Sequence, residues 1–195
     1  VLYEASYNGD TTAVLDASIS GIENLTIRDV AVTDGGAGAN TIHTATVTVN
    51  AGFTGAALTI DGSALDAHPT TLTSGERLSV DASNNTAAEA VTVTGGAFSD
   101  SILGGGAIDN LTGGAGADTI KGGGGADVIV GGSGADTLEG EAGIDHISGG
   151  DGNDTISVTD HSDFKTSGGA ETVDGGAGND TLSFSELIAG GLTIT

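Results

Sequence analysis

The sequence predicts an all-β fold, in which short strands stack in parallel coils as a β-roll within a longer β-solenoid. Three observations predict it: a period of nine residues, glycines at fixed places in that period, and one aliphatic residue in each period. The composition agrees, because 36 glycines and a single proline allow frequent turns while backbone N–H groups remain available for β-ladders.

The nine-residue unit runs without a break from Gly95 to Ser157 and occurs once more over residues 175–183. Position six is aspartate and position eight is isoleucine or leucine in all eight units. The aspartates are Asp100, Asp109, Asp118, Asp127, Asp136, Asp145, Asp154 and Asp180. The aliphatic residues are Ile102, Leu111, Ile120, Ile129, Leu138, Ile147, Ile156 and Leu182. A match of this length is not a chance event, so the units are expected to repeat one structure.

Each unit is predicted to form one tight turn and one very short strand. Glycines at positions one, two and four permit the positive φ angles that such a turn requires. The last three residues, as in Thr119-Ile120-Lys121, alternate so that the middle side chain points inward. Two units then complete one coil, and neighbouring coils stack as parallel strands about 4.8 Å apart.

A coil of two units places alternate aspartates on the same edge of the roll. One edge is expected to carry Asp100, Asp118, Asp136 and Asp154, and the other Asp109, Asp127 and Asp145. Two carboxylates one strand spacing apart repel by about 3 kcal/mol at an effective dielectric constant near 20. Because this repulsion would recur down both edges, the pattern predicts cations between the turns.

Calcium is the cation that the pattern favours. It accepts roughly six to eight hard oxygen ligands in flexible geometry, whereas magnesium prefers a near-ideal octahedron. The chain has no cysteine and its histidines are not periodic, which disfavours zinc and copper. One aliphatic side chain per unit makes a thin core, so metal binding is expected to supply folding free energy.

The units resemble the RTX repeats, also called hemolysin-type calcium-binding repeats. Those that begin at Gly113, Gly122, Gly131, Gly149 and Gly175 fit the consensus GGxGxDxUx strictly. The resemblance implies a right-handed parallel β-roll that binds several calcium ions, each shared by the position-six aspartates and turn carbonyls of two same-edge units. The implied pairs are Asp118–Asp136, Asp136–Asp154, Asp109–Asp127 and Asp127–Asp145. The implied turn ligands include Gly113, Gly114, Gly116, Gly122, Gly123, Gly125, Gly131, Gly132, Gly134, Gly149, Gly150 and Gly152.

Three units depart from this consensus in their turns. Residues 98–99 replace the Gly-x pair of the first unit, Ala107 stands at position four of the second, and Glu141 stands at position two of the sixth. The consensus therefore gives less support to sites at these turns, above all to a site shared by Asp100 and Asp118.

The nonapeptide frame is expected to be interrupted over residues 158–174. Asp160 and Asp163 could still act as calcium ligands there. The alternative is a solvated bulge, with Phe164 as a cap on the end of the core.

Residues 1–94 are expected to form an irregular β-solenoid that leads directly into the roll over 95–183. A trailing β segment is expected over 184–195, with further chain after it. Alternating threonine and aliphatic residues predict the strands. These segments are residues 25–27, 46–49, 58–60, 78–80 and 91–93. An independent β-sandwich is the alternative for this half. Residues 35–43 are interpreted as a decayed unit with Asn40 in the place of aspartate, where a calcium ion is a weaker expectation.

Composition and motifs exclude several classes of function. The formal net charge of −23 argues against nucleic acids and anionic membranes as partners. No apolar run approaches the ~20 residues of a membrane span. The four histidines, His43, His68, His146 and His161, have no serine or cysteine partner by motif, so they are expected to be surface residues. With no catalytic constellation, the chain is not expected to be an enzyme.

Three classes of function remain open at this point. The resemblance implies type I secretion and calcium-dependent folding outside the cell, which fits a bacterial surface-layer or adhesin-like protein. Such a protein would contact copies of itself in a lattice, or cell-surface polysaccharide. The second class is the carrier module of a secreted hydrolase or toxin, and the third is a calcium buffer or an ice- or carbohydrate-binding solenoid.

Overall fold

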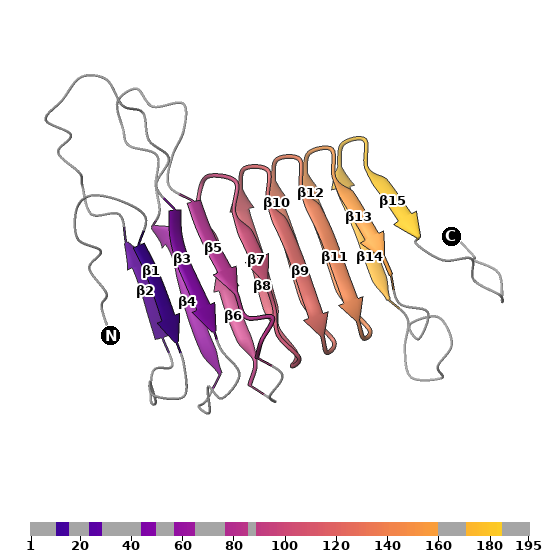
Figure 1. The fold of residues 1–195 in the computed structure, drawn as a ribbon. Coiled ribbons are helices and arrows are strands. Elements are labelled where there is room, and N and C mark those ends of the chain that lie inside the picture. The colour runs from indigo at the N-terminus through magenta and orange to yellow at the C-terminus, as the bar shows by residue number, and fades with distance from the viewer. Residues whose placement is uncertain are drawn as a thin grey trace, which may run out of the picture.

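The computed structural model describes residues 11–15, 24–28, 44–49, 57–64, 77–85, 89–159 and 171–184. Within these residues the fold is all-β, with fifteen strands and no helix. The strands lie side by side in one elongated body that runs from the N-terminal to the C-terminal end (Figure 1). The predicted fold class is therefore confirmed.

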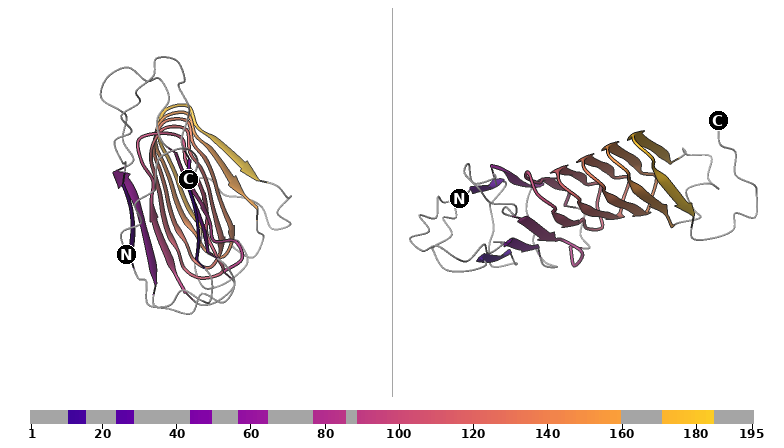
Figure 2. Two further views of the ribbon diagram at one scale, coloured as in Figure 1. Left: turned by 60° about the vertical axis from the view of Figure 1, so that its left-hand side comes forward. Right: turned by 90° about the horizontal axis from the view of Figure 1, so that it is seen from above.

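The strands alternate between two parallel sheets, so that each coil contributes one strand to each sheet (Figure 2). The eight-stranded sheet contains β1 (Thr11–Leu15), β3 (Thr44–Val49), β5 (Arg77–Asp81), β7 (Ser101–Leu103), β9 (Thr119–Gly124), β11 (Thr137–Ala142), β13 (Thr155–Val158) and β15 (Thr181–Phe184). The seven-stranded sheet contains β2 (Asn24–Arg28), β4 (Leu58–Ala64), β6 (Val91–Thr94), β8 (Asn110–Ala115), β10 (Val128–Ser133), β12 (His146–Asp151) and β14 (Thr172–Ala177).

Strand register in the roll confirms the coil of two units. Ile120 in β9 pairs with Leu138 in β11, and Ile129 in β10 pairs with Ile147 in β12. Most strands of the roll are longer than the three residues that the sequence predicts, because they continue through the first glycines of the next unit. These glycines lack a side chain that would separate the coils, so the ladder hydrogen bonds extend to the turn.

The core is a double column of aliphatic side chains between the two sheets. In the roll each strand up to β13 buries its position-eight residue at no more than 1% exposure. These residues are Ile102, Leu111, Ile120, Ile129, Leu138, Ile147 and Ile156. Leu182, in the last described strand, is 42% exposed.

The first half continues the same two sheets. Strands β2 to β6 coincide with the five segments that the sequence predicts, and β5 and β6 pair in parallel with β7 and β8 of the roll. This continuity rules out an independent β-sandwich. Strand β1 was not predicted, although residues 8–10, Asn-Gly-Asp, are a turn signal directly before it and its threonine and aliphatic residues are typical of a strand. Asn40, Asp160, Asp163, Phe164 and the C-terminal strand lie outside the described residues.

Candidate metal centre

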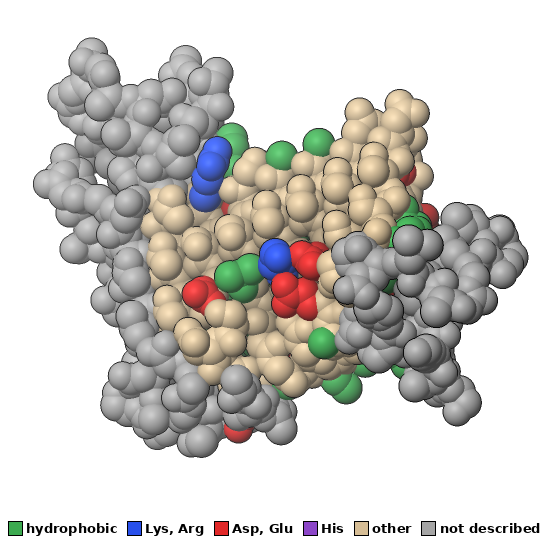
Figure 3. Space-filling model, turned by 45° about the vertical axis from the view of Figure 1, so that its right-hand side comes forward, with side chains coloured by type: hydrophobic (Ala, Val, Ile, Leu, Met, Phe, Trp, Pro, Cys, Tyr) green, Lys and Arg blue, Asp and Glu red, His purple; other side chains and the backbone are tan. Residues whose placement is uncertain are grey.

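The repeat aspartates lie at the turns, immediately before the strands. Asp118 is the residue immediately before β9, and Asp127 is the residue immediately before β10. The seven aspartates from Asp100 to Asp154 are at most 3% exposed, whereas Asp180 is exposed. On the face shown in Figure 3 few acidic side chains are visible over the roll, although the chain carries 27 acidic residues.

A hydrogen-bonded ladder joins the aspartates of each edge. On one edge the N–H of Asp100 donates to Oδ1 of Asp118 at 2.7 Å, and the N–H of Asp118 donates to Oδ1 of Asp136 at 2.8 Å. On the other edge the N–H of Asp109 donates to Oδ1 of Asp127 at 2.8 Å. The side chains that the sequence assigns to each edge are thus neighbours.

The second carboxylate oxygen of the regular repeats has a different role. Oδ2 of Asp118, Asp127, Asp136 and Asp154 is buried and has no hydrogen-bond partner. Native proteins rarely leave such an oxygen buried without a partner, because its desolvation is not compensated. These four oxygens are therefore suited to bind a cation.

Glycine at position one creates the space in front of this oxygen. A Cβ at Gly113 would overlap Oδ2 of Asp118 and the carbonyl oxygen of Gly131 in the next coil. A Cβ at Gly131 would overlap Oδ2 of Asp136 and the carbonyl oxygen of Gly149 in the same way. Carboxylate and carbonyl oxygens from two consecutive coils thus converge between the turns, and both are ligands that calcium accepts.

The electrostatics of the columns favour the binding of a cation. Burial, with smaller contributions from the neighbouring Asp100 and Asp136 carboxylates, raises the pKa of Asp118 to about 7. Burial likewise raises the pKa of Asp127 to about 7, with Asp109 and Asp145 as its charged neighbours. The described Lys121 does not neutralise them, because it pairs with Glu139 at 2.7 Å on the outside of the sheet.

The described residues contain no group of three or more histidine, cysteine, aspartate or glutamate side chains that could hold a metal. A metal in the roll would therefore be held by two carboxylates and several backbone carbonyls. This donor set, all oxygen, fits calcium and does not fit zinc or copper.

Comparison with known families agrees with this chemistry. A family model described as the RTX calcium-binding nonapeptide repeat (4 copies) matches residues 103–138, 130–160 and 166–183. The chain contains RTX calcium-binding repeats. No curated protein and no solved structure gave a significant match. In the described part of the chain no helix could span a membrane.

The RTX match resumes at residue 166, inside the stretch over which the sequence predicts an interruption. Thr172 pairs with His146, so Glu171 takes the position-six place next to Asp145. Val173 takes position eight and packs against the core, partly buried. Sequence reasoning missed this unit because it required aspartate at position six. The signal was the spacing, since Glu171 lies nine residues before Asp180.

The first two RTX turns differ from the regular ones. The N–H of Gly96 donates to Oδ2 of Asp100, and the N–H of Gly105 donates to Oδ2 of Asp109, both at 2.7 Å. In the regular turns the position-two residue has positive φ, for example 110° at Gly114, and this hydrogen bond is absent. The first two turns thus satisfy their own carboxylates, and a cation there must compete with a backbone N–H.

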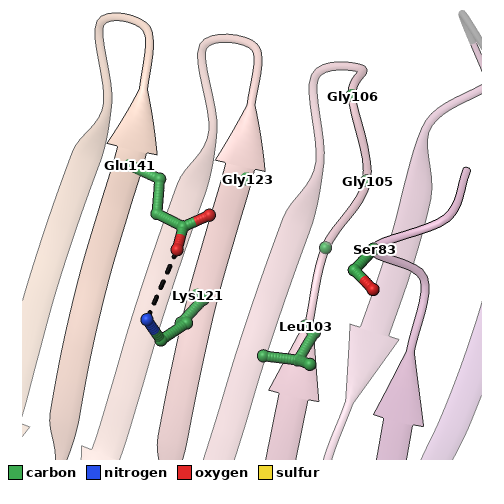
Figure 4. A pocket seen from close by; sticks show the side chains of 8 residues that line it. Ser83, Leu103, Gly105, Gly106, Lys121, Gly123 and Glu141 are labelled. Carbon is green, nitrogen blue, oxygen red and sulfur yellow. Dashed lines mark hydrogen bonds and ion pairs between the residues drawn. The ribbon is translucent and has the colours of Figure 1, made fainter. Parts of the chain in front are cut away.

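Glu141 is the only described non-glycine residue with positive φ. It occupies position two of its RTX unit with φ 67°, and its carboxylate lies 3.4 Å from the Nζ of Lys121. The two side chains line a surface pocket with Leu103 and Ser83 (Figure 4). The turn geometry of the repeat is therefore imposed on a residue that disfavours it.

We expect Glu141→Gly to stabilise the calcium-loaded roll by about 0.5–1 kcal/mol. Relief of the left-handed conformation outweighs the chain entropy that glycine adds, and the exposed ion pair contributes little. Urea unfolding in saturating calcium measures the change. The matched control is Glu139→Gly, in the strand, which should destabilise the roll; a loss of stability in Glu141→Gly would contradict the expectation.

Proposed function

We propose that the chain is an extracellular structural module of a bacterial surface-layer or adhesin-like protein, which folds when calcium binds between same-edge turns. That RTX repeats form a calcium-binding structural module is established by the family; the cellular role is the proposal. The observation that carries it is the double column of buried carboxylates whose Oδ2 atoms lack a partner. Calcium supplies the charge that these columns need.

In this proposal each ion is shared by two turns of one edge. The ligands are the aspartate pairs Asp118–Asp136, Asp136–Asp154, Asp109–Asp127 and Asp127–Asp145, with the carbonyls of the turn glycines. The aspartate ladder and the position-one spaces support this sharing. Extracellular calcium modules have dissociation constants of about 10⁻⁴–10⁻³ M, so a roll of this kind stays unfolded before export and folds outside.

The continuity of the fold supports a surface protein. Strands β1 to β6 extend the two sheets of the roll. The described first half therefore continues the solenoid and is not a separate globular domain. A long polar rod is suited to contact copies of itself in a lattice, or cell-surface polysaccharide. Immunolabelling of intact cells should find the protein on the surface; release into the medium with a hydrolase or toxin domain would favour the carrier function instead.

We expect EDTA to unfold residues 95–183 and calcium to restore the β-structure. Without cations the buried carboxylates repel each other, and the thin aliphatic core cannot compensate for the entropy of ordering. Circular dichroism of the chain in EDTA, and then in excess calcium or excess magnesium, measures the recovery. Magnesium should restore far less signal, and a β signal that survives EDTA unchanged would overturn the metal-dependent fold.

A further inference from the structure

The turn between β5 and β6 carries the same signature as the calcium-facing turns. Outside the acidic columns of the repeats, two buried side-chain oxygens in the described part of the chain lack a hydrogen-bond partner: Oδ1 of Asn85 and Oε2 of Glu89. Both residues precede the first nonapeptide and lie outside the residues that the RTX family model matches. Neither therefore belongs to a repeat site.

Hydrogen bonds place Asn85 directly next to the first turn of one acidic edge. The N–H of Gly106 donates to the carbonyl of Asn85 at 2.8 Å, and in the next coil the N–H of Gly124 donates to the carbonyl of Gly105 at 2.9 Å. Because Gly106 and Gly124 both stand at position three, Asn85 takes the position-two place, one coil before Gly105.

Glu89 lies on the same edge. The N–H of Val91 donates to Oδ1 of Asp109 at 2.7 Å, as the N–H of Asp109 does to Oδ1 of Asp127 in the next coil. Val91 therefore takes the position-six place, and Glu89, two residues earlier, corresponds to position four. Asn85 and Glu89 thus occupy the position-two and position-four places of a turn that lies one coil before the first RTX turn of this edge.

The surrounding contacts fix the Asn85 amide. Asn85 is 1% exposed, its N–H donates to the carbonyl of Ala82 at 2.8 Å, and its Nδ2 donates to the carbonyl of Glu89 at 3.2 Å. Only Oδ1 is left without a partner. A buried amide oxygen and a buried carboxylate oxygen in one turn, neither with a hydrogen-bond donor, match the ligand chemistry of a hard cation.

We propose that Asn85 and Glu89 bind a further calcium ion, at the end of the acidic edge that starts with Asp109. This inference rests on the proposed calcium-dependent function and extends it beyond the repeats. The site has one carboxylate and one amide oxygen where a repeat site has two carboxylates, so it is weaker than the repeat sites. It would be the last site to fill, and it would fasten the roll to the preceding solenoid coil.

Counting bound ions tests the site. Native mass spectrometry and equilibrium dialysis with calcium, on the whole chain, compare the wild type with Glu89→Gln and Asn85→Ala. Each variant should bind one ion fewer at the calcium concentration that just saturates the wild type. Glu139→Gln is the matched control, because it removes a carboxylate from the outer face of the sheet, and it should bind the wild-type number.

A gain-of-charge variant keeps the test informative if a loss variant folds poorly. Asn85→Asp should tighten the weakest calcium-binding step severalfold. A wild-type chain that binds no calcium would overturn the proposed function. A wild type that binds calcium, with unchanged ion number in Glu89→Gln and unchanged affinity in Asn85→Asp, would overturn this site alone and leave a buried water as the partner of both oxygens.

Discussion

Asp136→Ala is expected to remove two calcium sites and to destabilise the loaded roll by more than about 3 kcal/mol. Asp136 is 1% exposed, its Oδ1 accepts the N–H of Asp118 at 2.8 Å, and its own N–H donates to Oδ1 of Asp154 at 2.9 Å. Alanine leaves the Asp118 N–H without an acceptor and removes a ligand that two ions would share. The bound-calcium number and the calcium midpoint of the circular dichroism signal measure both effects.

Asp180→Ala is the comparison within the same edge. Asp180 lies after the interruption of the repeat frame and is exposed. Its Oδ1 accepts only the N–H of Asp154, at 3.0 Å. It should serve at most one ion, so its loss should cost less calcium and less stability than the loss of Asp136. Equal losses of bound calcium in the two variants would contradict the shared-ligand geometry.

Asp136→Asn separates the charge from the hydrogen bond. The amide keeps an oxygen for the Asp118 N–H but removes a buried negative charge and places a donor towards the cation. It should therefore destabilise the roll in calcium and stabilise it in metal-free buffer. Destabilisation by similar amounts in both conditions would mean that Asp136 acts through the hydrogen bond alone.

The roll could be predicted from sequence because each unit repeats the same local information. The eighteen-residue coil, the inward position-eight residues such as Ile129 and the grouping of Asp118 with Asp136 all follow from the period, and the structure places them as predicted. The hydrogen bond from the backbone N–H of one aspartate to the carboxylate of the aspartate one coil later does not follow from the period, because it depends on the side-chain rotamer.

The turns that depart from the consensus show where sequence reasoning ends. That Gly96 and Gly105 donate to their own aspartates depends on the orientation of one peptide group, which no residue type specifies. Glu171 was hidden by a consensus that admits only aspartate. Asn85 and Glu89 belong to no repeat at all, and only their burial without partners reveals them.

The two halves of the solenoid use the same inward place differently. The N–H of Leu78 donates to Oδ1 of Asp100, so Leu78 holds the place that an aspartate holds in each following coil. Val91 does the same before Asp109 on the other edge. Strands β5 and β6 therefore bury two aliphatic side chains each, Leu78 with Val80 and Val91 with Val93, where strands β7 to β12 of the roll bury one. At this place the first half of the solenoid buries an aliphatic residue, whereas the roll buries a carboxylate.

This difference predicts that protons can partly replace calcium. Burial raises the pKa of Asp118 and Asp127 to about 7 in the metal-free fold, and raises the pKa of Asp100, Asp109 and Asp136 in the same direction, from a usual value of 3.8. The folded chain then holds protons that the unfolded chain releases. Their stabilising contribution is fully present below pH 3.8 and is lost as the pH rises through about 7.

The metal-free roll should therefore gain β-structure as the pH falls from 8 to about 5, where the unfolded carboxyls still ionise. The protein should be stripped of metal by dialysis, because chelators lose affinity in acid, and circular dichroism should be recorded above the isoelectric point of about 4.1. In calcium the dependence reverses in sign, since the ligands must lose their protons to bind the ion, and calcium affinity should fall as the pH falls below 7.

The double variant Asp118→Asn/Asp127→Asn identifies the groups that titrate. It should flatten the pH dependence of the metal-free chain, because two carboxyls whose pKa is raised to about 7 are replaced by amides that are neutral at every pH. Glu139→Gln/Glu141→Gln removes the same number of charges from the outer face and should leave the dependence as in the wild type. If the metal-free chain is equally unfolded at pH 8 and pH 5, burial of these carboxylates is not what opposes its folding, and the thin aliphatic column is the remaining cause.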